Sequence, residues 1–360
     1  MNVFGLLFVF ASSLYLPQSV EMVFAGDAMQ HSRQLDDARR NDGGYDYSAY
    51  FTALEPYIQS ADYAVVNLET PLGGKPYSGY PMFCAPDSYL TQLKKSGFDL
   101  ILAANNHTLD RRDKGVVRTI EQFNKENIPY TGIYRNKAER DSVCPVIRDI
   151  NGFKIAFLNY TYGTNGLRIQ GNIVVDYIDK KQIAADIARA REKGAEIIAA
   201  CMHWGVEYVL LPNDEQKKLA DFLEDQGVDL IIGSHPHVIQ PMEMRYSEKH
   251  HKKVFLVYSL GNFISAMHKD DTQGGAMARV RIVRDKTGRA VVDTASYRLV
   301  FVSQPTSADN KFRLLPAETN VAAPMKGPRD RFVRNAERIF TKHNINVPRD
   351  TASIPPITIY

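Results

Sequence analysis

The sequence predicts an α/β fold whose parallel strands are covered on both faces. Its short strands are continuous apolar runs rather than alternating patterns, which is typical of strands buried on both sides. Twice, an amphipathic helix, a glycine and an apolar strand follow one another and end in a polar loop, over residues 86–107 and 213–237. With 360 residues and 44% apolar content, the chain can bury a large core.

The first half of the chain supplies three of the expected strands. Apolar runs at residues 22–27 and 63–69 predict the first two. A helix that begins at Asp87 or Ser88, both good N-cap residues, then leads into a strand at residues 98–103. Each of these strands is followed by polar residues, so functional side chains are expected where the strands end.

The second half repeats this plan and then changes in texture. Strands are predicted at residues 195–205 and 228–233. Residues 277–302 alternate apolar and polar side chains around a turn, which predicts a β-hairpin that extends one sheet. An irregular connection is expected at residues 303–327, followed by a helix at residues 328–343 with an apolar face.

The N-terminus is uncharged and apolar up to Pro17, without the basic start of an ordinary signal peptide. It is interpreted as a signal segment, with a structural strand as the alternative, and the run is too short for a membrane span of roughly 20 residues. The chain is accordingly divided into an N-terminal segment, a main domain and a C-terminal extension that packs on it: residues 1–20, 21–268 and 269–360.

Charge and cysteine content exclude several classes of protein. The chain has 44 basic and 41 acidic residues without long runs of one sign, so no nucleic-acid partner is expected. The cysteines Cys84, Cys144 and Cys201 form no C-x-x-C pair, which argues against a disulfide scaffold or a cysteine-rich zinc module. Partners must therefore be inferred from a site.

The predicted strands end in carboxylates, amides and imidazoles. In α/β folds, functional groups gather at the carboxyl ends of the strands, where loops converge on a rigid frame. Taken singly, each residue has a plain alternative: a histidine is usually a surface or core residue, and an asparagine pair is usually part of a turn. The polar residues at these ends are Asp27, Asn67, Glu69, Asn105, Asn106, His107, His203, His235 and His237.

Taken together, these residues indicate a metal site. About six nitrogen and oxygen donors without a thiolate suit a pair of divalent ions such as Mn, Fe or Zn. His235 and His237 are separated only by Pro236, which stiffens the loop between them, so the two imidazoles can serve neighbouring ions.

Six spaced motifs carry a family resemblance. Across residues 20–265 the sequence resembles the CapA family, also called PgsA, of capsule or poly-gamma-glutamate synthesis proteins, which belongs to the calcineurin-like metallophosphoesterase superfamily. The resemblance implies a four-layer α-β-β-α sandwich with a two-metal centre at one edge. The motifs are GD (26–27), NLET (67–70), ANNHTLD (104–110), MHWG (202–205), GSHPH (233–237) and YSLGNF (258–263).

The resemblance also implies a role for each strand-end residue. The roles are first metal for Asp27 and His237, bridging carboxylate for Glu69, second metal for Asn106, His203 and His235, and catalytic acid for His107. One position departs from the superfamily pattern, because Met29 stands where a histidine ligand is usual, and a thioether suits a hard ion poorly. His31, two residues further on, is a candidate substitute or substrate contact, with a surface role as the alternative.

Several neighbours of the site are candidates for lesser roles. Asp110 is expected to orient His107, or else to cap a helix. Candidate substrate contacts are Arg111 and Arg112, which suit an anionic group or form a solvated pair; Trp204, which walls a pocket or packs in the core; and Tyr162, in a polar segment that lines a cleft or forms a turn.

Two hypotheses follow for the function. The first is a hydrolase in which a metal-activated water attacks phosphoester or amide bonds of an anionic polymer and His107 protonates the leaving group. The second is a non-enzymatic polymer-binding or assembly subunit with a structural or vestigial metal site. The N-terminus and the family together predict an extracytoplasmic location, with membrane-bound polymer synthesis proteins as partners.

Overall fold

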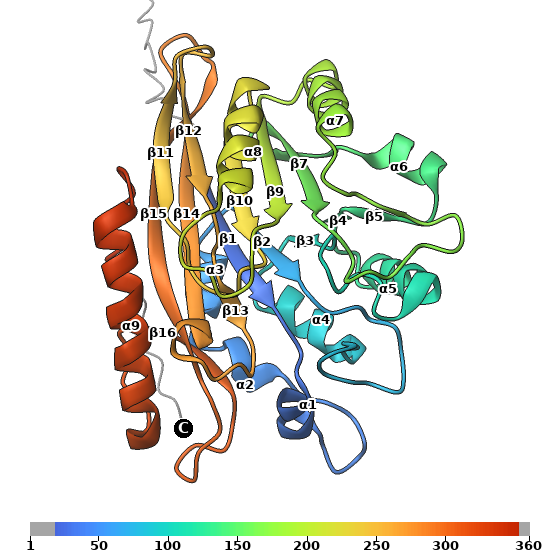
Figure 1. The fold of residues 1–360 in the computed structure, drawn as a ribbon, viewed down its shortest axis with the longest axis vertical. Helices are drawn as coiled ribbons and strands as arrows, with labels where there is room; N and C mark the ends of the chain where they lie inside the picture. Colours follow the sequence, from blue (N-terminus) through green and yellow to red (C-terminus); the bar gives the residue numbers. More distant parts are fainter. Residues whose placement is uncertain (1–18, 353–360) are drawn as a thin grey trace, which may run out of the picture.

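The computed structural model describes residues 19–352 (Figure 1). The apolar N-terminal segment interpreted as a signal lies outside the described residues, except for Ser19 and Val20, which open strand β1. Within the described range, the strands form an eight-stranded sheet, a six-stranded sheet and a two-stranded ribbon.

The first sheet has the order β16-β15-β14-β1-β2-β3-β4, with β13 paired to β1. Strand β1 is parallel to β2 and antiparallel to β14, so the C-terminal hairpin of β14 and β15 extends this sheet, as predicted. The bounds are β1 Ser19–Ala28, β2 Tyr63–Leu68, β3 Leu100–Leu102, β4 Tyr130–Thr131, β13 Asn262–Ile264, β14 Gly274–Arg284, β15 Ala290–Ser303 and β16 Arg313–Pro316.

The second sheet has the order β11-β12-β10-β9-β7-β6, in which the four inner strands run parallel. Every residue of β9 and β10 is buried, which confirms the reading of continuous apolar runs as strands covered on both faces. The bounds are β6 Val146–Ile150, β7 Phe153–Thr161, β9 Ile197–His203, β10 Leu230–Ser234, β11 Met242–Ser247 and β12 Lys252–Val257; the ribbon pairs β5 Ile133–Tyr134 with β8 Val174–Val175.

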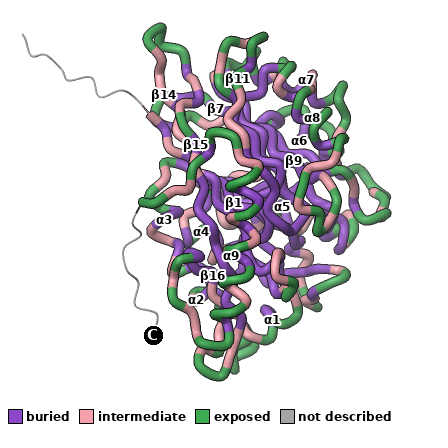
Figure 2. The backbone as a smooth tube through the Cα atoms, turned by 60° about the vertical axis from the view of Figure 1, so that its left-hand side comes forward, coloured by how far each residue is buried: buried purple, intermediate pink, exposed green. Residues whose placement is uncertain are grey.

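Helices cover the outer faces of both sheets, so the fold is the expected four-layer α-β-β-α sandwich (Figure 1). The two sheets bury a shared core that includes Phe24 and Phe157, and the buried backbone runs through the centre of the molecule (Figure 2). The helices are α1 Ser32–Ala38, α2 Ser48–Phe51, α3 Glu55–Gln59, α4 Asp87–Lys95, α5 Arg112–Lys125, α6 Lys137–Val143, α7 Lys180–Glu192, α8 Asp214–Asp225, α9 Ala323–His343 and the 3-10 turn η1 Asp270–Thr272.

Three boundaries differ from the prediction. Helix α4 is preceded by Pro86, in an extended conformation, so Asp87 lies in its first turn rather than at the cap. Strand β16 lies inside the region expected to be irregular, because four residues pair with the edge of β15. Helix α9 begins at Ala323, with a proline in its first turn, and Pro328 lies within it rather than at its start.

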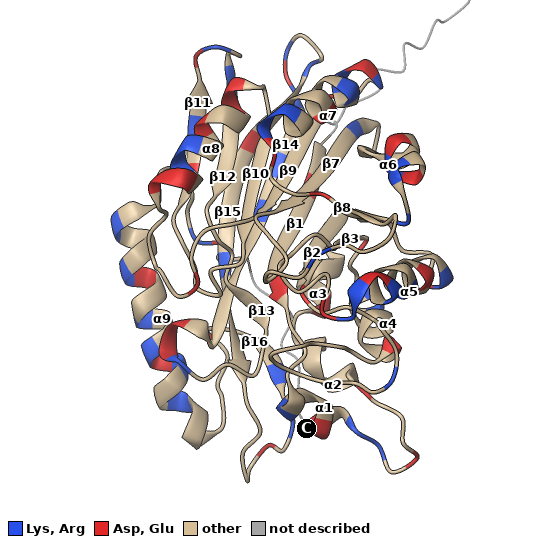
Figure 3. Cartoon of the chain, turned by 45° about the vertical axis from the view of Figure 1, so that its right-hand side comes forward, with Lys and Arg blue, Asp and Glu red and all other residues tan. Residues whose placement is uncertain are grey.

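Helix α9 packs its predicted apolar face against β15. The ring centroids of Phe340 and Tyr297 are 4.4 Å apart, and those of Phe332 and Phe301 are 6.1 Å apart. Charged residues are found mainly on the helices and loops, while the central strands carry few of them (Figure 3). Among residues 19–352, no helix combines the length and the apolar character needed to span a membrane.

Candidate metal centre

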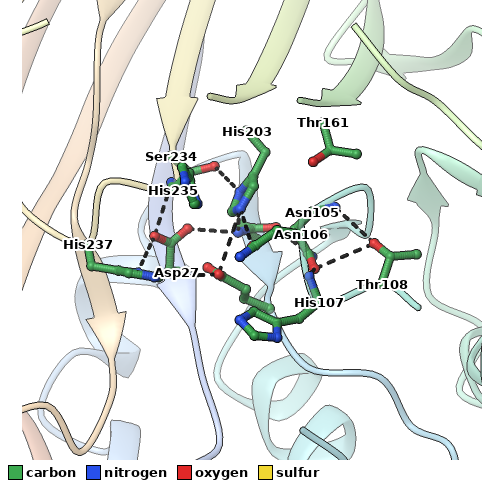
Figure 4. Close-up of polar contacts among 12 residues, drawn as sticks. Asp27, Asn105, Asn106, His107, Thr108, Thr161, His203, Ser234, His235 and His237 are labelled. Atoms are coloured by element: carbon green, nitrogen blue, oxygen red, sulfur yellow. Dashed lines mark hydrogen bonds and ion pairs between the residues drawn. The ribbon is translucent and has the colours of Figure 1, made fainter. Parts of the chain in front are cut away.

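The strand ends of both sheets meet at one buried cluster of polar side chains (Figure 4). Asp27 lies near the end of β1, and Glu69 directly follows β2 in the first sheet. His203 closes β9 and His235 directly follows β10 in the second sheet. The structure therefore brings together, across two sheets, residues that are more than 200 positions apart in sequence.

Glu69 lies at the centre of this cluster. Its side chain is fully buried, and neither carboxylate oxygen has a hydrogen-bond partner among the described residues. The Nε2 atoms of His203 and His237 each lie 3.7 Å from its Oε1. Burial, followed by the charge of Asp27, raises the pKa of Glu69 well above its usual value. A buried carboxylate with no donor is costly, so this geometry fits a bound cation.

Glu69 is shared by two groups of donors, each with ligand atoms within 4.8 Å of one another. One group joins it to His235 and His237, and the other joins it to Asp27 and His203. The shared carboxylate matches the bridging position that the family resemblance implies. The groups divide the other donors differently from that scheme, which placed Asp27 with His237, although these two side chains do touch, with His237 Nδ1 3.2 Å from Asp27 Oδ2.

The loop that carries the two histidines has an unusual backbone. His235 and His237 have φ values of 99° and 57°. A positive φ is uncommon for any residue other than glycine. The backbone N–H of His235 donates to Oδ2 of Asp27 over 3.2 Å, which ties the loop to β1. In this conformation one ligand atom from each ring lies within 4.8 Å of a carboxylate oxygen of Glu69.

The hydrogen bonds of His237 and His235 indicate which ring nitrogen of each is available as a ligand atom. His237 Nδ1 lies 3.1 Å from Asn262 Oδ1, so its Nε2 is the nitrogen that faces Glu69. The Nδ1 atom of His235 is buried and has no hydrogen-bond partner within residues 19–352. Burial and the neighbouring His237 lower the pKa of His235 to about 3, so the ring is neutral and able to act as a ligand.

Asn106 contacts His203 of the second sheet and is itself held by Asn165. The Oδ1 atom of Asn106 lies 2.8 Å from His203 Nε2, and the Nδ2 of Asn106 donates to Asn165 Oδ1 over 3.3 Å. This contact assigns the oxygen of Asn106, rather than its nitrogen, to the cluster. Burial and the charge of His235 hold the pKa of His203 well below its usual value.

Asp27 is held in the ionised form. Burial raises the pKa of its carboxyl group, but the hydrogen bonds and charge of His237 and the amide of Asn67 outweigh burial, so the pKa lies below the usual value. The Nδ2 of Asn67 donates to Oδ1 of Asp27 over 2.7 Å. Asn105 in turn donates to Asn67 and to the carbonyl of Leu68, which fixes the amide in place.

His107 and Asp110 form the predicted pair. The Nδ1 of His107 donates to Oδ2 of Asp110 over 2.7 Å, and both residues are buried. The same oxygen accepts the backbone N–H of Phe83 over 2.7 Å, and the Phe83 ring packs edge-on against the imidazole at 4.6 Å. The ring of His107 is therefore fixed in orientation, with Nε2 as its remaining nitrogen.

Met29 and His31 make contacts with neighbouring elements of the fold. Met29 is buried beside β1, and its carbonyl oxygen accepts hydrogen bonds from Gln34 and Tyr89. His31 precedes helix α1, where its Nδ1 accepts the backbone N–H of Ala266 over 3.3 Å. His31 is in neither of the two donor groups found among the described residues, so its role as a substitute ligand stays a prediction.

The remaining candidates take different places. Trp204 is buried, and its Nε1 donates to the carbonyl of Tyr258 over 2.8 Å, so it packs in the core rather than against a pocket. Tyr162 is 48% exposed, with its ring 4.5 Å from that of His235. Arg111 bonds the carbonyl of Pro76, and Arg112 is exposed at the start of α5.

Sequence reasoning missed the residues that orient the ligands. Asn165, Asn262 and Phe83 contact Asn106, His237 and the His107–Asp110 pair. Asn262 lies in the YSLGNF motif and Asn165 in the polar segment that holds Tyr162, but neither was given a role. A hydrophobic residue such as Phe83 carries no signal of this kind in the sequence. Phe83 contributes through its backbone N–H, which Asp110 accepts, and through its ring, which packs against His107.

Comparison with known proteins places the whole cluster in one family. Residues 21–267 match the family described as "Bacterial capsule synthesis protein PGA_cap". The chain belongs to this family. All eight predicted catalytic and metal-binding residues lie inside the matched range of this capsule synthesis family: Asp27, Glu69, Asn106, His107, Asp110, His203, His235 and His237.

Two curated members of the family align over most of the chain. The capsule biosynthesis protein CapA of Bacillus anthracis is 27% identical over 294 residues, which cover 77% of this chain and 66% of that protein. The PGA biosynthesis protein CapA of Bacillus subtilis (strain 168) is 27% identical over 271 residues, or 74% and 68% of the two chains. The aligned part thus spans about two thirds of each relative.

A solved structure shares the fold. A Staphylococcus aureus protein described as a candidate 5′-nucleotidase, in complex with alpha-ketoglutarate, superposes with a TM-score of 0.51 at 13% sequence identity. The match covers 88% of this chain and 58% of that one. At this level of identity the likeness concerns the metallophosphatase-type fold alone.

Proposed function

We propose that the chain is a metal-dependent hydrolase of phosphoester or amide bonds in an anionic polymer of the capsule or poly-gamma-glutamate kind. The observation that carries the proposal is Glu69, whose two oxygens are buried without a hydrogen-bond partner within the described range, while its Oε1 lies 3.7 Å from the Nε2 atoms of His203 and His237. The printed names of the two CapA relatives support the class of polymer.

The donor set fits two divalent ions that share Glu69. Asp27 and His203 would serve one ion, and His235 and His237 the other, with the oxygen of Asn106 beside His203. Carboxylate, amide and imidazole donors suit Mn, Fe or Zn. When bound, such a pair supplies Lewis acidity and a water of lowered pKa.

His107 is the proposed general acid. Its Nε2 would give a proton to the leaving oxygen or nitrogen as the scissile bond breaks. Asp110 is a positioning residue, because its carboxylate accepts the Nδ1–H of His107. This contact orients the imidazole so that Nε2 is the nitrogen that donates the proton. Phe83 supports both groups by its backbone N–H and its ring.

A second function is favoured by one observation. Met29 is buried at the position where the family resemblance implies a further histidine ligand, and its thioether suits a hard ion poorly. A weakened centre would suit a non-enzymatic polymer-binding or assembly subunit. In both functions we propose association with the cell envelope and with membrane-bound polymer synthesis proteins, on the basis of the capsule biosynthesis relatives.

Metal content tests the centre. Protein purified without chelator should contain about two Mn, Fe or Zn ions per chain by plasma mass spectrometry, the number that a shared carboxylate serves. His235→Ala should lower this content, while His250→Ala, on a surface turn between β11 and β12, should not. One ion or none after reconstitution would favour the binding role.

Turnover tests the acid. His107→Ala should lower hydrolysis of phosphodiester or γ-glutamyl substrates by about 10²- to 10⁴-fold, the usual contribution of a general acid, with metal content unchanged. Asp110→Asn should lower it less and shift the pH profile, because it removes the charge that holds the imidazole. Equal turnover of His107→Ala and wild type would reject the assignment.

A further inference from the structure

A rigid loop presents a tyrosine at the edge of the metal centre. The mouth loop, residues 205–209, is part of the connection from His203 at the end of β9 to helix α8, which begins at Asp214. Tyr208 has φ of 67°, an unfavourable value for a bulky side chain, and yet its ring is 42% exposed. Strain of this kind persists only where the surroundings hold it, and it is concentrated at functional sites.

The contacts that hold the strain lead directly to the ligands. The backbone N–H of Tyr208 donates over 2.8 Å to the carbonyl of Pro236, the residue between the two ligand histidines. The next carbonyl, of Val209, accepts the side chain of Gln240, which in turn accepts the Nε2 of Gln216 over 2.8 Å. Both glutamines are buried, so the loop is anchored although its side chains face outward.

The ring of Tyr208 lies near both His237 and the ammonium group of Lys269. Its centroid is 6.2 Å from that of His237, and the Nζ of Lys269, an exposed residue from another loop, lies 4.1 Å from it. Tyr162 flanks the other histidine, with its ring 4.5 Å from His235, and its backbone N–H donates to the carbonyl of His203. Two tyrosine rings thus stand beside the two histidines that follow β10.

We propose that Tyr208 and Lys269 form a specificity-determining wall that binds the substrate segment next to the scissile bond, opposite Tyr162. The wall suits a chain in which anionic groups are separated by short aliphatic stretches. The ring face packs against methylene groups, and the ammonium group pairs with one anionic group. This inference rests on the proposed function and names the part of the site that selects the substrate.

Glu207 sharpens the selectivity of the wall. It is partly buried and directly precedes Tyr208 on the mouth loop. A second anionic group immediately beside the first would be repelled by this carboxylate. The wall therefore favours spaced anionic groups over densely charged ones.

The test compares variants that remove the wall without altering the backbone. Tyr208→Asn keeps a residue that tolerates positive φ but removes the ring, Tyr208→Phe removes only the hydroxyl, and Lys269→Met removes only the charge. Tyr246→Ala, on the edge strand β11 and 56% exposed, is the control for loss of a surface tyrosine. Metal content is measured for every variant.

Binding and turnover are measured with a γ-linked glutamate octamer. Tyr208→Asn and Lys269→Met should each weaken equilibrium binding to metal-loaded protein about tenfold, as for loss of one central contact, and raise KM more than they lower kcat. The Lys269→Met protein should also lose part of the salt dependence. Wild-type affinity in both variants, equal losses in Tyr246→Ala, or no binding of the octamer by wild type would overturn the wall.

The two proposals fail differently. If wild-type protein binds the octamer through the wall but cleaves neither it nor a phosphodiester, the hydrolase function fails and the wall stands. If wild type hydrolyses a substrate and the wall variants match its KM and its affinity for the octamer, the wall fails and the hydrolase stands.

Discussion

Two buried clusters of charged side chains in this molecule are built on opposite principles. In the first, between α6, α7 and β8, Arg140 bonds Asp176 and Asp186 over 2.5 Å each. The hydroxyl of Tyr134 donates to the other oxygen of Asp176, and Gln182 donates to the other oxygen of Asp186. In the second, the metal centre, both oxygens of Glu69 and one nitrogen of His235 have no partner within residues 19–352.

The difference separates a cluster that the protein completes from one that it leaves open. Buried polar groups are paired in native structures, and a buried charge without a partner is strongly unfavourable. The Arg140 cluster therefore contributes to the folded state as it stands. Within residues 19–352, the oxygens of Glu69 have no hydrogen-bond donor. The donor atoms of the two groups converge around them, where a cation would fit.

The largest effect is expected where a completed cluster is broken. Arg140→Ala leaves two buried carboxylates facing each other and should lower the free energy of unfolding by about 3–5 kcal/mol. Urea unfolding followed by circular dichroism measures it. Arg135→Ala, an exposed arginine on the neighbouring turn, is the control and should change stability little. A small loss for Arg140→Ala would mean that the cluster relaxes or admits water.

The open cluster should respond in the opposite way. Glu69→Gln replaces a carboxylate disfavoured by burial with a neutral amide, so metal-free protein should be at least as stable as wild type. Its stabilisation by metal should disappear, a loss of about 4 kcal/mol at a metal concentration 1,000 times the dissociation constant. Thermal unfolding with and without Mn measures both. Destabilisation of the metal-free variant would show that Glu69 is a structural charge.

A pH titration distinguishes the two clusters further. Burial raises the pKa of Asp176 to about 6, despite the attraction of Arg140. Because the folded state then binds more protons than the unfolded state between about pH 4 and 6, stability falls as pH rises through this window, by roughly 2–3 kcal/mol. Asp176→Asn should remove this slope, and Asp141→Asn, on the exposed side of α6, should keep it. Equal slopes in wild type and Asp176→Asn would contradict the assignment.

The smallest effect is expected from a residue that only orients a ligand. Asn165→Gly retains the positive φ of this position but removes the oxygen that accepts from Asn106. Metal affinity should fall about tenfold, at the lower end of losses for such supporting contacts. Isothermal titration with Mn measures it, and Asn151→Gly, an exposed turn residue with positive φ, is the control. Unchanged affinity would show that Asn106 needs no second partner.

The order of the ligands along the chain was predictable because each lies where an apolar run ends. Asp27 and His203 lie at the ends of their strands, and Glu69 and His235 directly follow theirs. The apolar runs of these strands are local, and the carboxyl ends of parallel strands meet at one edge. The pairing of His107 with Asp110 was also accessible, since three residues separate them in a single turn. These features need only short stretches of sequence.

Other features depended on contacts between distant segments. Trp204 follows a ligand directly, yet its ring turns into the core because a carbonyl of Tyr258 accepts its N–H. His31 was a candidate ligand by position, and only the structure shows that its Nδ1 accepts the backbone N–H of Ala266 and that its ring packs edge-on against Phe83. The helix that was expected to begin at Pro328 begins earlier, at Ala323, and packs on β15.

The sequence by itself determined the class of fold, the strand ends that carry chemistry and the donor types that suit divalent ions, because hydrophobic periodicity and residue type are local properties. Only the tertiary structure decided which donors share Glu69, which oxygens lack partners and which loop stands over the site. Those outcomes depend on how the two sheets pack against each other, because this packing brings ligand atoms from the ends of β1, β9 and β10 to within 4.8 Å of a carboxylate oxygen of Glu69.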